Sequence, residues 1–597
     1  MTFNGHHITG KNLLASLKSV QSNISVRLTI CALIAGLLGG YGSLAFRIAI
    51  DEVQQLFYGF GGELVVSQAI HLPWWKILLI PVIGGLLVGI CLKIFHSERR
   101  TEGVADVIES VMINRGKMKF LPGVGTFLTS AISLGTGGSG GREGPVVHFG
   151  ATIASQIAQG LRIPSRYYPI LIGCGVASGV AASFNAPIAG MFFALEVVLG
   201  SLATQAVAPI VLAAVIGTVV TRIHIGDFPA FIIPHYQIIS WWEIPAISLL
   251  GVVSAIVGLL FIWSMGFSER TIKRFRIPII LRPAAGGLVL GAIAIFFPQI
   301  IGVGYEATDS ALQGEYELIL LLSLIVIKTV AVGITFGSGF GGGFFSPSLF
   351  VGAMTGGAFG LIAATIFPDL AASHGLYAII GMTAVACAVL SAPISTIMIV
   401  FELTGDYKIA ILVMIAVAIT TLITRQIAGK SIFQMQLAKR GVDLKDSKAL
   451  RYLKYRNVQG IMDTEFIKIL APTKIMDLLK IARDAPHDKF IIIDPETNSF
   501  KGRLDFADIK PHLFEETIDE EITALDLASH DTPTLRPNST LKQALHLFEE
   551  TGMDCIPVIE DAPNPKILGL LHSKDLFRKF NEALVDMQDE NRDKVIR

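Results

Sequence analysis

The chain has 597 residues, of which 52% are hydrophobic and only 16% charged, and its formal net charge is zero. A soluble globular protein usually carries about 25% charged residues, so the mean hydropathy of +0.60 favours a membrane protein. The neutral balance gives no indication of nucleic-acid binding. The five cysteines are scattered and lie mostly in apolar runs. They predict small buried side chains and neither a disulfide framework nor a metal site.

Apolar runs begin near residue 24, after a polar segment at 1–23 that we expect to be cytoplasmic. Runs such as ISVRLTICALIAGLLGGYGSLAF approach or exceed the roughly 20 residues that span a bilayer as a helix. No small-residue cleavage site follows the first run, which indicates a transmembrane helix and not a signal peptide. Basic residues gather at 93–100, at 268–276 and from 425 onward. The positive-inside rule places these links, and the tail that follows, in the cytoplasm.

The membrane part contains an internal repeat. GVASGVAASFNAPIAGMFFALE and GMTAVACAVLSAPISTIMIVFE share one spacing, in which a glycine, an Ala-Pro-Ile unit and a glutamate recur. The glutamates are Glu196 and Glu402, and Pro187 and Pro393 are expected to start short helices. Glycine-rich loops, GGSGGREGP and GSGFGGGFFSP, precede the two copies. Duplicated apolar segments interrupted by glycine and proline are typical of transporters with a site at the repeat interface.

The two glycine-rich loops predict an anion site. Pro145 and Pro347 lie just after them, where proline suits the first turn of a helix. Helix N-termini offer unpaired N–H groups and about half a positive charge, which suits an anion that must also be released. Glu143, in GREGP, is an anion tethered beside this site. We therefore expect Glu143 to compete with the permeant anion, as a gate or as a proton carrier.

Two other interpretations of the charged residues remain open. Arg142 and Glu143 would form a local ion pair that holds the loop, although adjacent side chains do not naturally face each other. A cation transporter, such as a magnesium channel, would need carboxylates or carbonyl rings along its pore. The membrane part offers four carboxylates for that purpose: Glu102, Glu143, Glu196 and Glu402.

An intramembrane enzyme is the third alternative. Residues 137–141 fit the G-x-S-x-G motif, with Ser139 as nucleophile and His148 as a base. The motif needs a strand before it and a helix after it, and apolar segments of a membrane protein do not provide that setting. We therefore predict that the chain is not an enzyme.

At these residues the sequence resembles the CLC family of chloride channels and chloride/proton exchangers. GREGPVVHFGA, GVASGVAASFNAPIAGMFFALE and GSGFGGGFFSPSLFVGA are similar to three signature regions of that family and follow its order. The resemblance covers 24–440. It implies an all-α polytopic membrane domain with two inverted halves, at about 24–225 and 240–430. It also implies a homodimer with a chloride pathway in each subunit, and protons as a second substrate in exchangers.

The resemblance assigns roles to individual residues. Glu143 matches the gating glutamate, and Arg142 and Gly144 belong to its motif. Phe344 and Phe345 match the residues whose backbone N–H groups coordinate the central anion.

The sequence departs from the family pattern at three positions. Glu102 takes the place of a serine that faces the anion, and Phe433 that of a pore tyrosine, so two hydroxyl donors are missing. Val197 stands where proton-coupled members often carry an inner glutamate, so the proton pathway would rely on Glu143 with Glu196 or Glu102 as a substitute. These departures predict channel-like or weakly proton-coupled transport, with a strict chloride/proton antiporter as the alternative.

The composition changes near residue 426. Strand-like pieces at 490–494, 555–560 and 567–571 alternate with helix-like pieces, which predicts a small α/β domain. This tail resembles a pair of cytoplasmic CBS domains, at 456–514 and 521–585. A linker at 441–455 precedes the pair and a C-terminal tail at 586–597 follows it. The lack of targeting signals favours a bacterial inner membrane.

CBS pairs often bind adenine nucleotides, and the resemblance places the ribose-binding aspartates at Asp508 and Asp575. Three residues earlier stand Asp505, which would repel a phosphate, and His572, which tolerates one. ATP is therefore expected at the second copy, with a tail that only dimerises as the alternative. No cofactor is expected to be required for transport.

Overall fold

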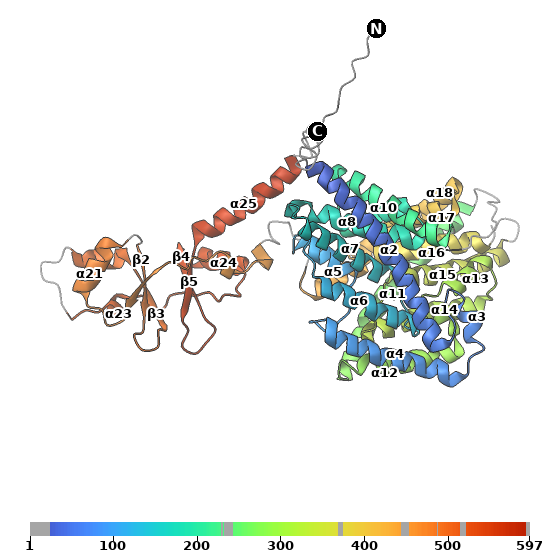
Figure 1. Cartoon of the computed structure of the whole chain (residues 1–597), viewed down its shortest axis with the longest axis horizontal. Helices are drawn as coiled ribbons and strands as arrows, with labels where there is room; N and C mark the ends of the chain where they lie inside the picture. The colour runs from blue at the N-terminus through green and yellow to red at the C-terminus, as the bar shows by residue number, and fades with distance from the viewer. Residues whose placement is uncertain are drawn as a thin grey trace, which may run out of the picture. The chain divides into compact units, whose positions relative to one another are not determined.

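The computed structural model describes residues 24–227, 231, 243–367, 374–442, 453–485, 488–513 and 521–592. The chain divides into two compact units, Met1–Asp443 and Leu444–Arg597, which are described separately (Figure 1). The division falls inside the linker predicted at 441–455. The N-terminal segment at 1–23, most of that linker and the last part of the predicted C-terminal tail lie outside the described residues.

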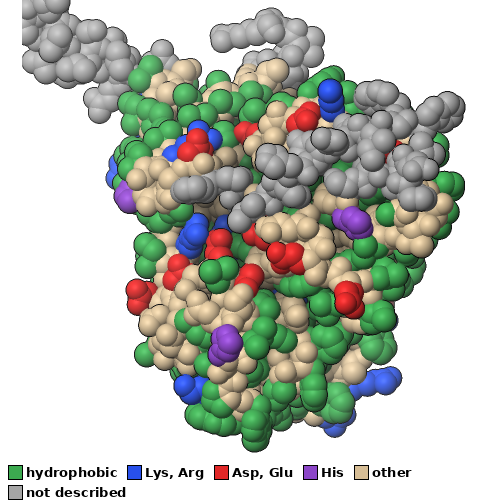
Figure 2. All heavy atoms as spheres, turned by 90° about the vertical axis from the view of Figure 1, so that its right-hand side faces the viewer, with side chains coloured by type: hydrophobic (Ala, Val, Ile, Leu, Met, Phe, Trp, Pro, Cys, Tyr) green, Lys and Arg blue, Asp and Glu red, His purple; other side chains and the backbone are tan. Residues whose placement is uncertain are grey.

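The membrane unit is helical throughout its named elements. Eight helices among the described residues are long and apolar enough to cross a membrane, as the apolar runs predict. Hydrophobic side chains are spread over the face drawn in Figure 2, as expected for a surface in contact with lipid. The helices of the first half are α2 (Ile24–Tyr58), α3 (Val65–Ala69), α4 (Trp74–Phe95), α5 (Val104–Met112), α6 (Phe120–Gly135), α7 (Glu143–Gly160), η1 (Ser165–Tyr167), α8 (Tyr168–Phe184), α9 (Pro187–Phe193), the π-helical turn η2 (Ala194–Val198) and α10 (Thr204–Ile225).

The second half repeats this pattern of long and short helices. Pro187 and Pro393 each begin a helix, and Pro145 and Pro347 each lie in the first turn of one, as predicted. The helices of the second half and the segment after it are α11 (Ile244–Arg274), α12 (Arg282–Phe296), η4 (Pro298–Ile300), α13 (Tyr305–Gln313), α14 (Leu318–Ser338), α15 (Phe345–Ile366), α16 (His374–Leu390), α17 (Pro393–Thr404), α18 (Tyr407–Ile427) and α19 (Ile432–Lys439).

The sequence repeat is also a repeat of helix packing. In the first half α7 crosses α8 at Gly150 and Gly175, where a Cβ on either residue would collide with the other's carbonyl oxygen. In the second half α15 crosses α16 at Gly352 and Gly381 with the same mutual contact. Small residues allow such close approach of membrane helices. The glycines that open the two sequence copies, Gly175 and Gly381, are therefore required by equivalent crossings.

Each half also caps a short helix of the other half. The carboxylate of Glu402 in α17 accepts hydrogen bonds from the N–H groups of Ile188, at 2.9 Å, and Ala189, at 2.8 Å, in the first turn of α9. The carboxylate of Glu196 in η2 accepts from the N–H group of Ser395, at 2.8 Å, and from its hydroxyl, at 2.6 Å, in the first turn of α17. Protein carboxylates therefore fill the amide ends of both short helices.

The two glycine-rich loops pair with each other. The N–H group of Gly141 donates to the carbonyl of Gly343 at 2.7 Å, and the N–H group of Gly343 donates back at 2.6 Å. This pairing brings the starts of α7 and α15 together, and Gly144 packs against the backbone of the opposite loop. The loops thus set the relative position of two helix N-termini from different halves.

The tail unit has two similar halves. The three predicted strands are confirmed as β2, β4 and β5, and the first half of the tail contains two further strands, β1 and β3, that the sequence analysis did not predict. β1 runs parallel to β2, β2 pairs antiparallel with β3, and β4 pairs antiparallel with β5. The elements are η5 (Val458–Gly460), β1 (Ile467–Leu470), α21 (Ile475–Asp484), β2 (Lys489–Ile493), β3 (Phe500–Asp505), α22 (Phe506–Ile509), η6 (Lys510–Leu513), α23 (Ala524–Leu527), α24 (Leu541–Thr551), β4 (Cys555–Ile559), β5 (Ile567–His572) and α25 (Ser573–Arg592).

The two halves of the tail contact each other through their sheets. Ile491 and Ile493 of β2 share an apolar cluster with Cys555 of β4. Arg503 donates to the carbonyl of Cys555 at 2.7 Å. Burial raises the pKa of the Cys555 thiol to about 12, so this cysteine is a buried, protonated side chain, as the sequence predicts.

Gly144→Ala is expected to destabilise the membrane unit. The added Cβ would lie 2.9 Å from the Cα atom of Gly343 and 3.0 Å from the carbonyl oxygen of Gly342, and backbone atoms cannot easily move away. We expect a loss of about 1–3 kcal/mol, measured as a lower unfolding temperature in detergent. Gly160→Ala is the matched control on the same helix, because nothing lies within 4 Å of its Cβ position. Equal losses in the two variants would contradict the close approach.

Glu196→Ala is expected to lower the unfolding temperature through the loss of a helix cap. The N–H groups of Ile394 and Ser395 would lose their acceptor, which costs about 1 kcal/mol for a typical cap. Glu196→Gln keeps an acceptor oxygen and is expected to cost less. If Glu196→Gln instead removed proton movement without affecting stability, the proton-pathway role would be favoured over capping.

Candidate functional site

Glu143 lies at the first position of α7 and is 2% exposed. Its carboxylate accepts hydrogen bonds from the hydroxyl of Tyr305, at 3.0 Å, and from the N–H group of Ser346, at 3.3 Å. The hydroxyl of Ser346 also donates to it. Ser346 is the second residue of α15, so the carboxylate occupies the N-terminal end of a helix from the other half. An anion favours that place because N–H groups and the helix dipole point toward it.

Arg142 does not hold Glu143 in a local ion pair. One guanidinium nitrogen donates to the carbonyl of Ser183 at 2.9 Å, and another lies 3.3 Å from Glu63. The guanidinium group also lies over the ring of Tyr305, 4.5 Å from its centroid. Arg142 and Glu143 therefore contact the same tyrosine, Arg142 at the ring and Glu143 at the hydroxyl, without an ion pair between them among the described residues.

A small polar cavity of about 40 Å³ reaches this site. Arg47, Asp51, Glu63, Arg142 and Tyr305 contribute to its wall. Glu63 bridges the two arginines, at 3.1 Å from Arg47 and 3.3 Å from Arg142. The wall of this cavity thus brings charged side chains next to the tyrosine whose hydroxyl binds the Glu143 carboxylate.

Tyr305 is a site residue that sequence reasoning missed. It begins α13 directly after Gly304, whose φ of 89° places it in the left-handed region that favours glycine. Lys328, which is fully buried, donates to the carbonyls of Ile300 and Gly302 at 3.2 Å each and so holds the turn before Tyr305. In the sequence, Tyr305 is marked only by the glycines at 302 and 304 before it, and no local pattern indicates that its side chain meets Glu143.

Phe344 and Phe345 stand at the start of α15. Their rings are buried against other aromatic rings, Phe344 against Phe336 at 4.0 Å and Phe345 against Phe184 at 5.0 Å between centroids. Within the part of the chain that the structure describes, no hydrogen bond is recorded from the N–H group of either residue, as expected for the first turn of a helix. An anion-coordinating role for these N–H groups stays a prediction.

Glu102 is paired with a histidine. Its Oε2 atom lies 2.9 Å from Nε2 of His148, a residue of α7. The hydroxyl of Thr101 donates to the carbonyl of Phe340 at 3.5 Å, which places this segment beside the loop that leads into α15. The contact between Glu102 and His148 joins the segment before α5 to α7. The N–H group of Ser139 donates to the hydroxyl of Thr335 at 3.1 Å, while His148 lies against Glu102, so these two residues have different partners.

Two further predicted residues lie on neighbouring elements. Phe433 is the second residue of α19, is buried, and follows the capping residue Ser431. The helix packs against α5, and Arg440 just after it lies 2.8 Å from Asp106 in α5. Val197 is half-buried in η2, beside the cap residue Glu196. A proton-carrying role for Glu196 stays a prediction, since its carboxylate already binds the start of α17.

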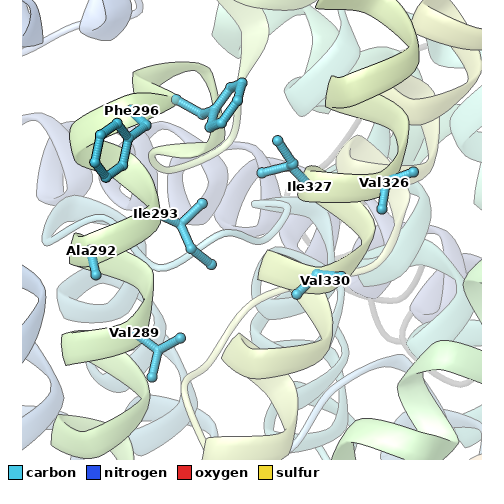
Figure 3. A pocket seen from close by; sticks show the side chains of 8 residues that line it. Val289, Ala292, Ile293, Phe296, Val326, Ile327 and Val330 are labelled. Atoms are coloured by element: carbon cyan, nitrogen blue, oxygen red, sulfur yellow. The ribbon is translucent and has the colours of Figure 1, made fainter.

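One groove of the membrane unit is lined by apolar side chains alone. Its volume is about 400 Å³, and it lies between α12 and α14 (Figure 3). Such a lining offers no donor to an anion. The residues around it are Val289, Ala292, Ile293, Phe296, Phe297, Val326, Ile327 and Val330.

In the tail unit the predicted aspartates make local contacts. Asp508 accepts from the N–H group of Asp505 at 3.0 Å and so caps α22. Asp505, which was expected to repel phosphate, lies 2.7 Å from Arg503, so its charge is balanced within the unit. Asp575 lies 2.9 Å from Arg578 in α25, and His572 ends the strand before it.

Comparisons with known proteins agree with this geometry. Residues 84–425 match the family described as voltage gated chloride channel, and residues 524–582 match the CBS domain. A putative chloride channel protein ClcB-like of Ralstonia nicotianae is 32% identical over 68% of this chain and 96% of its own length. The chloride channel protein CLC-f of Arabidopsis thaliana is 30% identical over 89% of this chain and 66% of its own length.

A solved structure shows the same fold. The crystal structure of a slow cyanobacterial Cl−/H+ antiporter matches with a TM-score of 0.63 at 20% identity, covering 69% of this chain and 98% of that chain. The paired half-helices, the carboxylate at a helix N-terminus and the family match lead to one assignment. The chain belongs to the CLC family of voltage-gated chloride channels and transporters, as a multi-pass membrane protein of anion transport with CBS domains in its C-terminal unit.

Proposed function

We propose that each subunit of a homodimer conducts chloride along the N-terminal ends of α7 and α15, and that Glu143 gates this pathway. One observation carries the proposal: the carboxylate of Glu143 accepts a hydrogen bond from the N–H group of Ser346 in the first turn of α15. A permeant anion would need the same N–H end. Carboxylate and chloride therefore exclude each other from this position.

The binding of the carboxylate at this position is weak enough to be reversed. A charge at a helix N-terminus typically gains about 0.3–1 kcal/mol, and up to about 2 kcal/mol when partly buried. Protonation removes the negative charge of Glu143 and with it most of its attraction to the helix end. The hydroxyls of Tyr305 and Ser346 are then free to turn toward an entering anion. Acid is expected to open the gate.

The carboxylates of the membrane unit favour an anion pathway over a cation pathway. Glu143, Glu196 and Glu402 all accept hydrogen bonds from backbone N–H groups, and Glu102 lies against His148. A cation pore would need free carboxylate or carbonyl oxygens along its wall. The magnesium-transporter alternative therefore has the weaker support.

Proton coupling is proposed to be weak. Val197 has no group that carries a proton, and the carboxylate of its neighbour Glu196 is engaged with the start of α17. Protons would then reach Glu143 without a fixed inner carboxylate at the usual place. Strict chloride/proton exchange is the alternative, and the same experiment decides between them.

Glu143→Gln is expected to abolish proton movement and the part of the pH dependence of chloride flux that comes from protonation of Glu143. The amide keeps the shape of the side chain but carries no charge that competes with chloride. The measurement is chloride and proton flux from liposomes that contain the purified protein, under an imposed chloride gradient. Uphill proton movement by the unchanged protein would establish exchange, and large chloride flux without it would establish a channel.

Glu402→Gln is the matched control for this experiment, since its carboxylate also sits on a helix N-terminus but far along the chain from the glycine loops. It is expected to keep the pH dependence of the unchanged protein. The gating role would be excluded if Glu143→Gln retained the proton movement and the full pH dependence of the unchanged protein.

We also propose that the second half of the tail binds an adenine nucleotide through Asp575. Asp575→Asn is expected to weaken ATP binding by about tenfold or more, because a hydrogen bond to a charged group contributes roughly 1.5–3 kcal/mol. Asp508→Asn is the matched control, since Asp508 is engaged in capping α22. Isothermal titration of the full-length protein in detergent measures both. Absence of binding heat at millimolar ATP would favour a tail that only dimerises.

A further inference from the structure

A second cluster of titratable side chains lies apart from Glu143. It consists of His96 at the end of α4, Glu102 in the segment before α5, and His148 in α7. The side chain of His148 is 1% exposed and that of Glu102 28% exposed. His96 is 3% exposed, and neither of its ring nitrogens has a hydrogen-bond partner among the described residues. The gate described above uses none of these groups.

The other charges around this cluster pair with one another. Arg100 lies 2.7 Å from Asp106 and 2.8 Å from Glu98. Arg440, just after α19, lies 2.8 Å from Asp106 and 3.2 Å from Glu109. His148, His96 and Asp106 all lie close enough to Glu102 to act on its charge. The imidazole of His148 is in direct contact, with its Nε2 atom 2.9 Å from Oε2 of Glu102. The group in contact with the Glu102 carboxylate is therefore an imidazole, a side chain that carries a charge only when it is protonated.

The cluster flanks the anion pathway. His148 follows Glu143 by five residues in α7, which is about 7.5 Å along a helix axis. The contact from Thr101 to the carbonyl of Phe340 places the Glu102 segment against the loop before α15. The surrounding ion pairs belong to a water-facing surface, because lipid does not solvate such a group of charges. Glu102 thus stands between this surface and the helix ends that attract anions.

We propose that Glu102 and His148 form an acid sensor that sets how readily anions enter from their side of the membrane unit. With His148 neutral and Glu102 ionised, the pair carries one negative charge and repels chloride. A proton taken from the adjacent solution by the imidazole brings the pair to zero charge, and the repulsion ends. The reverse step returns that proton to the same solution. The proposal deepens the proposed chloride pathway and rests on it, but it is independent of Glu143.

The test records chloride current across a planar bilayer while pH is changed on one side at a time. Acidifying the Glu102 side from about pH 8 to pH 6, a range in which histidine titrates, is expected to raise the current on the order of tenfold, as one nearby charge in a medium of intermediate dielectric can do. Acidifying the opposite side is expected to produce no such rise in the Glu143→Gln background. That background removes the response of the proposed gate and leaves the sensor response alone.

Three variants separate the sensor from a structural role. Glu102→Gln removes the repelling charge, so the current is expected to be high and flat over this pH range, because no negative charge remains for a proton to neutralise. His148→Gln leaves Glu102 without its cation, and the half-point is expected to move about 1–2 units toward acid, from a histidine range to a carboxyl range. Glu98→Gln is the control in the same segment, and it should leave the response unchanged because Glu98 pairs with Arg100.

Each outcome has a defined meaning. A full one-sided pH response in Glu102→Gln overturns the sensor, and so does a response of equal size from either side. Failure of the proposed gate has a different signature: Glu143→Gln would retain the full pH dependence of the unchanged protein, including a response to acid on the side opposite Glu102, while Glu102→Gln would still lose the one-sided response. If His148→Gln fails to fold in size-exclusion chromatography, Glu102→Gln alone decides the question.

Discussion

The close pairing of two helix N-termini is the constraint on which the rest of the structure depends. An unpaired N–H group at membrane depth costs free energy unless an acceptor, such as a carboxylate, receives its hydrogen bond. Here the glycine loops hold the starts of α7 and α15 against each other through the Gly141–Gly343 pair. The protein supplies its own carboxylate, Glu143, to the resulting site. In this structure the N–H group of Ser346 thus has an acceptor within the protein. In the proposed pathway, chloride takes the place of that carboxylate.

Much of this arrangement could be predicted from sequence because it depends on local pattern. The positions of glycine and proline predicted where helices start, and the repeated Ala-Pro-Ile units predicted two related halves. The strands of the tail followed from short apolar runs. The role of Glu143 at a helix end was expected because its motif combines glycines, a proline and an ionisable residue within a few positions.

What the sequence could not supply is the set of contacts between distant side chains. Tyr305 is 162 residues from Glu143, and no local signal indicates that they meet. The carboxylate of Glu196 was considered as a proton carrier because it neighbours Val197, yet it binds a helix 199 residues away at Ser395. The pairing of Glu102 with His148 also depends on tertiary placement. The departure from the family pattern identified Glu102 as unusual, but only the structure shows that His148 lies beside it.

The reciprocal caps have a consequence for how such a chain can be divided. Each half contributes the carboxylate that the other half's short helix needs. A fragment that ended between α10 and α11 would contain the N–H groups of Ile188 and Ala189 without the Glu402 carboxylate that accepts their hydrogen bonds. It would also contain Glu196 without the N–H group of Ser395 that donates to it. Neither half satisfies its own short helix. The two halves must therefore stay on one polypeptide or, if they are separated, reassemble as two complementary fragments.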